Sequence, residues 1–299
     1  MNERKRQVLL IAQRLFAEKG FTATSVQDIL DESQISKGTF YNYFTSKNEC
    51  LLVMLEYAYD EAIIKRRELL IGQDIQDKNI LSQQIVVRMQ INREHNLLPI
   101  YESIFHSGDV DLRSFIIKQH FLEISWLAGR LVDVYGKEAT PYAPDCAVIL
   151  MGMIQHLMHF GSASPTGKVD LNRLVHFTTR RIDAIIRDTI KSNDILIGTD
   201  LFLDLPPKAE PPADAKNVLH VQLGKFLANL TDDANANGVQ YAEFLLDEIS
   251  ADQPRVFLLE IIARSFHESF TNTRYEPEVR EIIAVLWSYV DTLKKKDFH

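Results

Sequence analysis

The segment with the most distinctive chemistry is residues 37–44, which reads Lys-Gly-Thr-Phe-Tyr-Asn-Tyr-Phe. As a helix it would need to bury only its two phenylalanines, so its polar side chains and tyrosines would face solvent. A lysine and a glycine at the start of a helix let the backbone N–H groups approach a phosphate closely. The threonine can contact a base edge or a thymine methyl group, and tyrosine and asparagine can donate hydrogen bonds to phosphates. This pattern favours a helix that binds nucleic acid over a solvated helix of a bundle. The residues concerned are Lys37, Gly38, Thr39, Tyr41, Asn42 and Tyr43.

Three helix-start signals surround this segment. They predict a helix of two turns over residues 25–32, a tight turn over 33–36 and a second short helix over 37–44. Two short helices across a tight turn form the helix-turn-helix layout. Lys47 falls in the first turn of the helix that follows, where its ammonium and the free backbone N–H groups could hold a flanking phosphate. The start signals are Thr24 with Gln27, Ser36, and Ser46 with Glu49.

These residues resemble the TetR family of bacterial transcription regulators. The resemblance runs through Leu15-Phe16-Ala17-Glu18-Lys19-Gly20-Phe21, Thr24, Ile29, residues 36–44 and Lys47. It implies a three-helix DNA-binding head, here about residues 3–44, followed by a helical body that binds an effector and dimerises. By this resemblance, the residues in the major groove would be Lys37, Gly38 and Thr39. The residues contacting the DNA backbone would be Thr24, Ser25, Tyr41, Tyr43 and Lys47.

The elements that must position these residues are expected to be helices throughout. Gly and Pro number only 12 and 10, and apolar residues recur at three-and-four spacing without a strand-like alternation. The fold class is therefore all-α, with a DNA-binding head at 1–48, an effector-binding and dimerisation body at 49–191, and additional helices at 217–299. A connector at 192–216 carries four prolines within residues 205–212, which excludes a helix interior there. In the last segment we expect four helices, at about 217–230, 238–250, 254–273 and 277–296.

The body offers aromatic and sulfur-containing side chains that could line an apolar effector pocket, although each alone fits an ordinary core position. The candidates are Tyr101, Phe105, Phe121, Trp126, Met153, His156 and Met158. The family resemblance implies a two-fold dimer built from helices at about 145–161 and 170–190. Their apolar residues exceed what a single inner face requires, in agreement with that role.

Other kinds of site find little support in the sequence. His156 and His159 are spaced as a helical pair, but no HExxH glutamate accompanies them, so packing is favoured over a metal site. No nucleophile motif or clustered acid pair indicates an enzyme, and we expect no cofactor. The two cysteines, Cys50 and Cys146, lack the spacing of a disulfide framework. Without an apolar stretch of about 20 residues or a signal peptide, we expect a cytoplasmic protein that does not span a membrane.

The net charge of −8 is unevenly distributed and does not argue against a nucleic-acid partner. Residues 1–48 carry a net charge of +2, residues 49–191 carry −2, and residues 192–299 carry −8. A weakly positive head can therefore meet DNA, while an acidic extra domain should be held away from it. The leading hypothesis is a homodimeric repressor released from a palindromic operator by a small apolar or amphipathic ligand. The alternative is a DNA-bound adaptor whose C-terminal helices recruit a protein partner.

Overall fold

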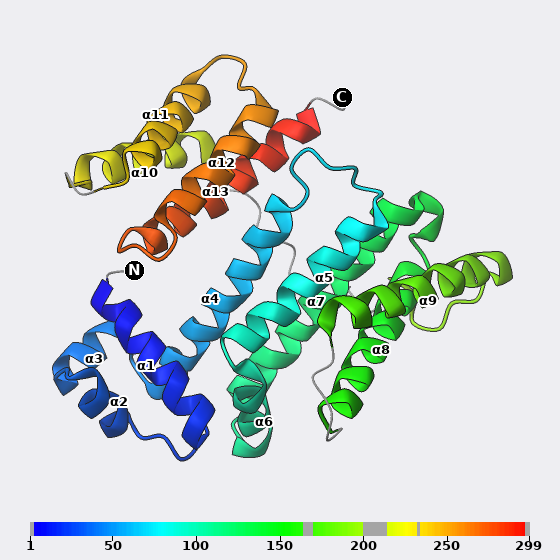
Figure 1. Ribbon diagram of the computed structural model, residues 1–299, viewed down its shortest axis with the longest axis horizontal. Coiled ribbons are helices and arrows are strands. Elements are labelled where there is room, and N and C mark those ends of the chain that lie inside the picture. Colours follow the sequence, from blue (N-terminus) through cyan, green and yellow to red (C-terminus); the bar gives the residue numbers. More distant parts are fainter. Residues whose placement is uncertain (1–2, 164–169, 200–213, 232–233, 297–299) are drawn as a thin grey trace. The chain divides into compact units, whose positions relative to one another are not determined.

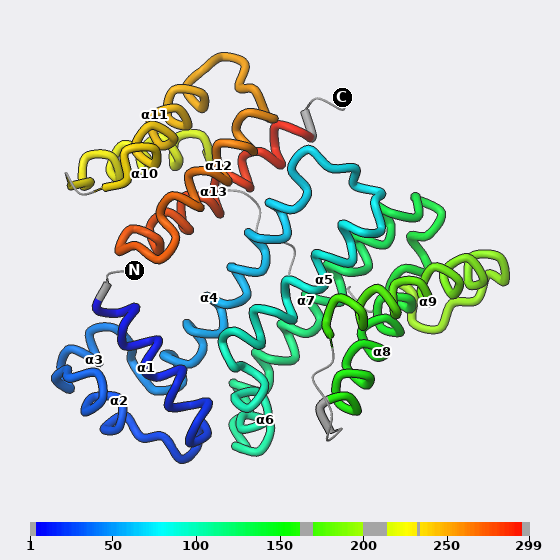
Figure 2. Tube along the Cα trace, viewed as in Figure 1, coloured from blue at the N-terminus to red at the C-terminus, as the bar shows by residue number. Residues whose placement is uncertain are grey.

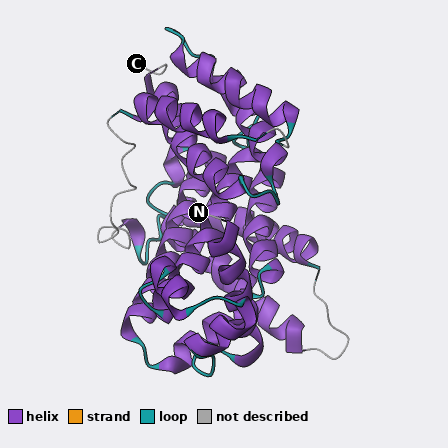
Figure 3. Cartoon of the chain, turned by 90° about the vertical axis from the view of Figure 1, so that its left-hand side faces the viewer, coloured by secondary structure: helices purple, strands orange, loops and turns teal. Residues whose placement is uncertain are grey.

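The computed structural model describes residues 3–163, 170–199, 214–231 and 234–296 (Figure 1). Every regular element in these ranges is a helix, as Figure 3 shows, which confirms the predicted all-α class. The helices fall into two compact units. One comprises Val8–Leu205, and the other comprises Pro206–His299 together with the first seven residues.

Three helices near the N-terminus form a small head, α1 (Glu3–Lys19), α2 (Val26–Ser33) and α3 (Lys37–Tyr43). Aromatic side chains from α1, from the loop after it and from α3 with its C-cap residue contribute to its interior. The ring of Phe16 contacts that of Phe21 edge-on at 5.2 Å between centroids, and Phe40 contacts Phe44 at 5.4 Å. All four are buried, so the two phenylalanines of residues 37–44 are the buried ones, as predicted.

Helix α4 (Lys47–Glu68) leads from the head into the body, as the chain trace in Figure 2 shows. The body continues with α5 (Lys78–Glu94), α6 (Leu97–Ser107), α7 (Val110–Tyr135), a short 3-10 turn η1 (Lys137–Ala139), α8 (Ala143–Ala163) and α9 (Leu171–Ser192). Helix α8 packs against α7 and α9, and α5 packs against α4 and α9. Aliphatic side chains of α5, α7, α8 and α9 form one continuous core. The body is thus a helical bundle around one core.

The second unit contains four helices, α10 (Ala215–Asn229), α11 (Ala236–Ser250), α12 (Val256–Phe270) and α13 (Glu276–Lys296). Each packs against the next, and α10 also packs against α13, which closes the bundle. Its centre is aromatic: Phe226 contacts Phe266 and Phe270 edge-on at 5.5 and 5.2 Å. All four helices were predicted, but α12 is shorter at both ends than residues 254–273, because it begins after the N-cap Arg255 and ends at the C-cap Thr271. Most of the proline connector, including residues 205–212, lies outside the described residues.

Candidate functional site

Helices α2 and α3 form the predicted helix-turn-helix, and their caps explain where each begins. Ser36 caps α3, since its Oγ accepts a hydrogen bond from the Thr39 backbone N–H at 3.1 Å. The turn between them is closed by Gln34, whose backbone adopts the left-handed conformation with φ 52°. The cap of α2 is Ser25, whose Oγ accepts from Asp28 N at 3.1 Å while Asp28 Oδ2 accepts from Ser25 N at 2.8 Å. The predicted box of Thr24 with Gln27 was therefore wrong by one residue.

The outer face of α3 carries the polar side chains that the sequence pattern assigned to it. Lys37, Gly38 and Asn42 are exposed, and Tyr41 is 45% exposed. Thr39 is half-buried, and its hydroxyl shares a hydrogen bond of 2.9 Å with Ser36. Tyr43 is half-buried and contacts Phe44 edge-on. One short helix thus presents a cation, amide and phenol groups, and a bare backbone on a single surface.

Thr24 and Lys47 lie elsewhere than on that surface. Thr24 is fully buried, and its hydroxyl donates to the carbonyls of Leu15 and Gly20 at 3.2 and 2.9 Å. The Lys47 ammonium donates to the carbonyls of Phe21 and Thr24 at 2.8 and 2.7 Å. Partial burial lowers the pKa of Lys47, opposed by the nearby charge of Asp28. The carbonyls of Gly20, Phe21 and Thr24 lie between α1 and α2, where they need hydrogen-bond donors from outside a helix. The two side chains supply donors and so stabilise this loop.

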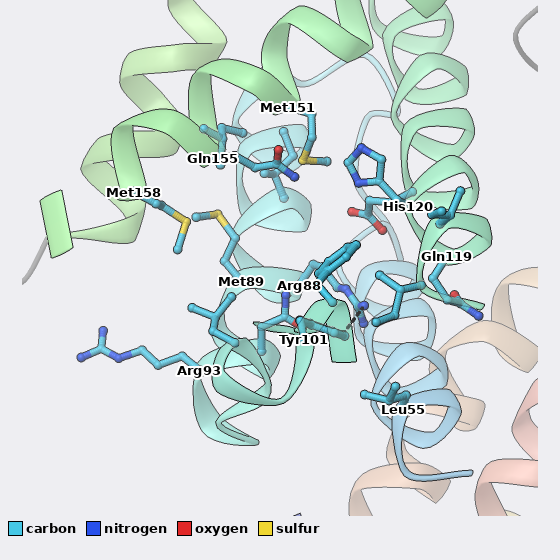
Figure 4. Close-up of a pocket in the computed structure, with 18 of the residues that line it drawn as sticks. Leu55, Arg88, Met89, Arg93, Tyr101, Gln119, His120, Met151, Gln155 and Met158 are labelled. Atoms are coloured by element: carbon cyan, nitrogen blue, oxygen red, sulfur yellow. Dashed lines mark hydrogen bonds between the residues drawn. The ribbon is translucent and has the colours of Figure 1, made fainter. Parts of the chain in front are cut away.

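A cavity of about 730 Å³ lies in the body and is lined from α4, α5, α6, α7, α8 and the start of α9 (Figure 4). Tyr101, Phe105 and Met158 line it, as the sequence led us to expect. Four other expected residues do not line it, namely Phe121, Trp126, Met153 and His156. The helical register explains the difference on α8, where the lining residues Met151, Ile154, Gln155 and Met158 share one face. Trp126 instead stacks on the guanidinium of Arg66, 3.6 Å from its ring centroid, and the ring of His156 contacts Phe160 at 5.0 Å.

Polar groups in this cavity were missed by the sequence analysis. Arg88 and Asn92 of α5 and Gln119 and Glu123 of α7 all line it. The signal in the sequence was Arg88 and Asn92 at helical spacing beside Ile85 and Met89, a pattern that sequence alone does not separate from exposed positions. Arg88 Nη2 donates to the Tyr101 hydroxyl at 3.3 Å, the contact drawn in Figure 4.

Glu123 is buried beside a second arginine. Arg66 Nη1 donates to Glu123 Oε2 at 2.9 Å, and Arg66 Nη2 donates to the other carboxylate oxygen. Burial opposes ionisation of this carboxyl, but the Arg66 charge and hydrogen bonds hold its pKa below its usual range. The pair ties α4 to α7, and Arg66 Nε also donates to the Gln84 carbonyl of α5 at 2.9 Å.

Helices α8 and α9 expose large apolar side chains, of which Phe160 is 65% exposed. The others are Ile149, Leu157 and Phe177, each about two-fifths exposed.

Within the described ranges no group of three or more His, Cys, Asp or Glu side chains is arranged to hold a metal ion. The same ranges contain no helix that is both long and apolar enough to span a membrane.

Comparisons with known proteins agree with this geometry. The model of the tetR family of bacterial regulatory proteins matches residues 9–54. The chain is 26% identical to the HTH-type transcriptional regulator YerO of Bacillus subtilis over 267 residues, 85% of this chain and 86% of YerO. It is 30% identical to YuxN of the same organism over 206 residues, 65% of this chain and 67% of YuxN. A shorter match, 31% over 100 residues, 33% of this chain and 48% of the relative, is to the HTH-type transcriptional repressor KstR2 of Rhodococcus jostii. No solved structure matches the chain.

The match to YerO extends well past the head. Because it covers 85% of the chain, it must include part of residues 206–299, so the sequence similarity extends into the C-terminal unit. All three relatives are named as transcriptional regulators and none as an enzyme. With a family match over α1–α3 and a relative 30% identical across two thirds of its own length, the chain belongs to the TetR family of bacterial DNA-binding transcriptional regulators.

Proposed function

We propose that this regulator is a homodimeric repressor that binds a palindromic operator and leaves it when a small apolar or amphipathic ligand enters the body cavity. The observation that carries the proposal is the exposed face of α3, where Lys37, Gly38 and Tyr41 lie together above the buried Phe40. A helix of this kind fits the major groove, where its first residues reach base edges. Because DNA is the partner, a cytoplasmic location follows from the proposal.

The apolar surface of α8 and α9 supports the dimer. Four large apolar side chains are exposed on these two helices, whose other faces contribute to the body core. A two-fold axis through such a surface would bury them against their own copies. It would also present two α3 helices to successive turns of one face of the DNA.

The cavity and α6 support ligand response. Leu98, Tyr101 and Phe105 of α6 line the cavity. On the same helix, the Ser103 hydroxyl accepts a hydrogen bond from the Phe21 backbone N–H of the head at 2.9 Å. A ligand that changes the position of α6 would therefore act directly on the loop that precedes α2. The name of KstR2 as a repressor favours repression over activation.

DNase I footprinting on the DNA upstream of the protein's own gene tests this function. We expect two protected half-sites related by a dyad, about 10 base pairs or a longer family-specific distance apart. A single unpaired protected site would contradict the dimeric arrangement, and the absence of protection with wild-type protein at low salt would contradict the proposal as a whole.

A further inference from the structure

We propose that the ligand of the body cavity is an apolar compound with one anionic headgroup, a carboxylate or a phosphate ester, and that Arg88 binds this headgroup. The inference rests on the proposed function, because it assigns the chemistry of the same cavity. It goes further by naming the charge of the ligand and the residue that selects it.

Arg88 has hydrogen-bonding capacity that the protein does not use. Its Nη1 atom is buried and has no hydrogen-bond partner among the described residues. Its Nη2 atom donates to the Tyr101 hydroxyl over a long 3.3 Å, and its guanidinium lies 5.4 Å from the Tyr59 ring centroid. A buried guanidinium N–H without an acceptor is costly, so an acceptor supplied by a ligand would be strongly favoured.

Among the described residues, Glu123 is the one carboxylate that lines the cavity, and it does not meet this need. Both oxygens of Glu123 accept from Arg66, which forms a paired, neutral unit with it. Arg88 therefore adds a positive charge in excess of that pair. An anion beside Arg88 would be compensated without disturbing the Arg66–Glu123 pair.

The Tyr101 phenol contacts this guanidinium, and two amides line the same cavity. Asn92 Oδ1 and Gln119 Oε1 are buried without a hydrogen-bond partner in the described structure, and both residues line the cavity. A flip of either side-chain amide exchanges its oxygen for its NH₂ group, which can then donate to a ligand in the cavity. Burial raises the pKa of Tyr101, opposed by the charge of Arg88, so its hydroxyl keeps its proton and can donate. An anion would find several donors here.

The rest of the cavity suits an apolar body. Its other lining residues are largely aliphatic, aromatic or methionine side chains, among them Ile85, Met89, Phe115 and Ile154. A volume of about 730 Å³ lies within the roughly 300–1,000 Å³ range of pockets that enclose small ligands. Unbranched methionine side chains adapt to ligands of different shape. The apolar part of the cavity therefore selects for an apolar ligand more than for a particular ligand shape.

Isothermal titration calorimetry of the DNA-free protein tests this with four probes of equal chain length: decanoate, decyl phosphate, decan-1-ol and decylamine. We expect at least one of the two anions to bind about tenfold or more tightly than the alcohol, and the amine to bind most weakly. The ratio of decanoate to decyl phosphate affinity then tells which headgroup the site prefers.

The variant Arg88→Met should remove this advantage, so that the preferred anion binds within about twofold of decan-1-ol. Arg187→Met is the matched control, because it makes the same change at an exposed arginine of α9 that does not line the cavity. It should leave the preference for the anion nearly unchanged. Far-UV circular dichroism, which measures helix content, checks that both variants fold.

Two results would overturn the inference. One is that neither anion binds more tightly than decan-1-ol or decylamine, and this includes the case in which no probe binds. The other is that Arg88→Met still prefers the anion over decan-1-ol. Neither result bears on DNA binding, which footprinting measures separately. A failed inference is therefore distinguishable from a failed function.

Discussion

Two lysines of the head have the same charge but different surroundings. Lys37 is exposed on α3, whereas Lys47 is half-buried, donates to two backbone carbonyls and lies 4.3 Å from the Phe21 ring centroid. The first is available to a phosphate, while the second stabilises the loop that leads into α2. The surroundings of a lysine, more than its position near the motif, thus decide its role.

Exchanging each lysine for methionine should separate the two roles. Lys47→Met should lower the free energy of unfolding of the head by about 1–2 kcal/mol, because two carbonyls lose a charged donor. Lys37→Met should leave stability within about 0.5 kcal/mol of wild type, since an exposed side chain is replaced. Amide hydrogen exchange of residues in α1 and α2 measures both. Equal destabilisation by the two substitutions would contradict this assignment.

Side-chain exposure on α3 could be predicted from the sequence, because the spacing of Phe40 and Phe44 fixes which face is buried. The roles of Thr24 and Lys47 could not, since their partners are backbone carbonyls that leave no side-chain pattern. Arg88 was missed for a similar reason. Its Tyr101 partner lies on another helix, and only tertiary packing brings the two side chains together.

At the scale of elements, α6 is in contact with both the body cavity and the head. It contributes lining residues to the cavity and also accepts the Phe21 N–H through Ser103. Asn48 at the start of α4 makes a second connection, donating to Asp109 before α7 at 2.7 Å. Specific hydrogen bonds therefore connect the head to the body, and one of them is made by α6.

Removing the Ser103 hydroxyl should loosen this connection. In Ser103→Ala, the buried Phe21 loses the acceptor of its N–H, which should cost about 1 kcal/mol. The protection of the Phe21 amide against hydrogen exchange should then fall about fivefold. Ser114→Ala on α7, an exposed serine, is the matched control and should have no effect at Phe21. Unchanged Phe21 protection in Ser103→Ala would argue against the α6 connection.

Packing within the C-terminal bundle makes a separate prediction. A Cβ atom at Gly238 would come within 2.6 Å of the buried ring of Phe270, whereas at Gly224 it would meet nothing within 4 Å. Gly238→Ala should therefore destabilise the bundle by about 1–3 kcal/mol through overpacking. Gly224→Ala should stabilise it by up to about 1 kcal/mol, because alanine favours a helix. Urea unfolding followed by the fluorescence of Trp287 measures both, and effects of the same sign would contradict the packing described.

At the scale of the whole molecule, the length of the chain and the uneven distribution of its charge indicated more than one domain. The structure contains two compact units. The four C-terminal helices could be predicted because their apolar residues recur on one face. The connector predicted from the prolines lies mostly outside the described residues. What this bundle binds could not be predicted, because an apolar core pattern describes only the inside of a domain. The dimer surface was expected through family resemblance and remains a proposal.

A charge on α8 should separate the protomers if that surface is the interface. Leu157→Asp should shift the protein toward monomer at micromolar concentration, because a carboxylate would be buried without a partner. Val110→Asp introduces the same charge at a residue that is 72% exposed on α7, and it should leave the oligomeric state unchanged. Analytical ultracentrifugation distinguishes the outcomes. A Leu157→Asp protein as dimeric as wild type would exclude this face of α8.

The central claim is that α3 binds DNA, and fluorescence anisotropy on the protein's own upstream DNA tests it most directly. Wild type should bind this DNA at least about tenfold more tightly than a scrambled duplex, with an affinity that falls steeply as salt increases. Lys37→Met should weaken binding and reduce the slope of log affinity against log salt by about 1 for each protomer bound. Equal binding to both duplexes, together with an affinity and salt slope unchanged in Lys37→Met, would contradict the claim.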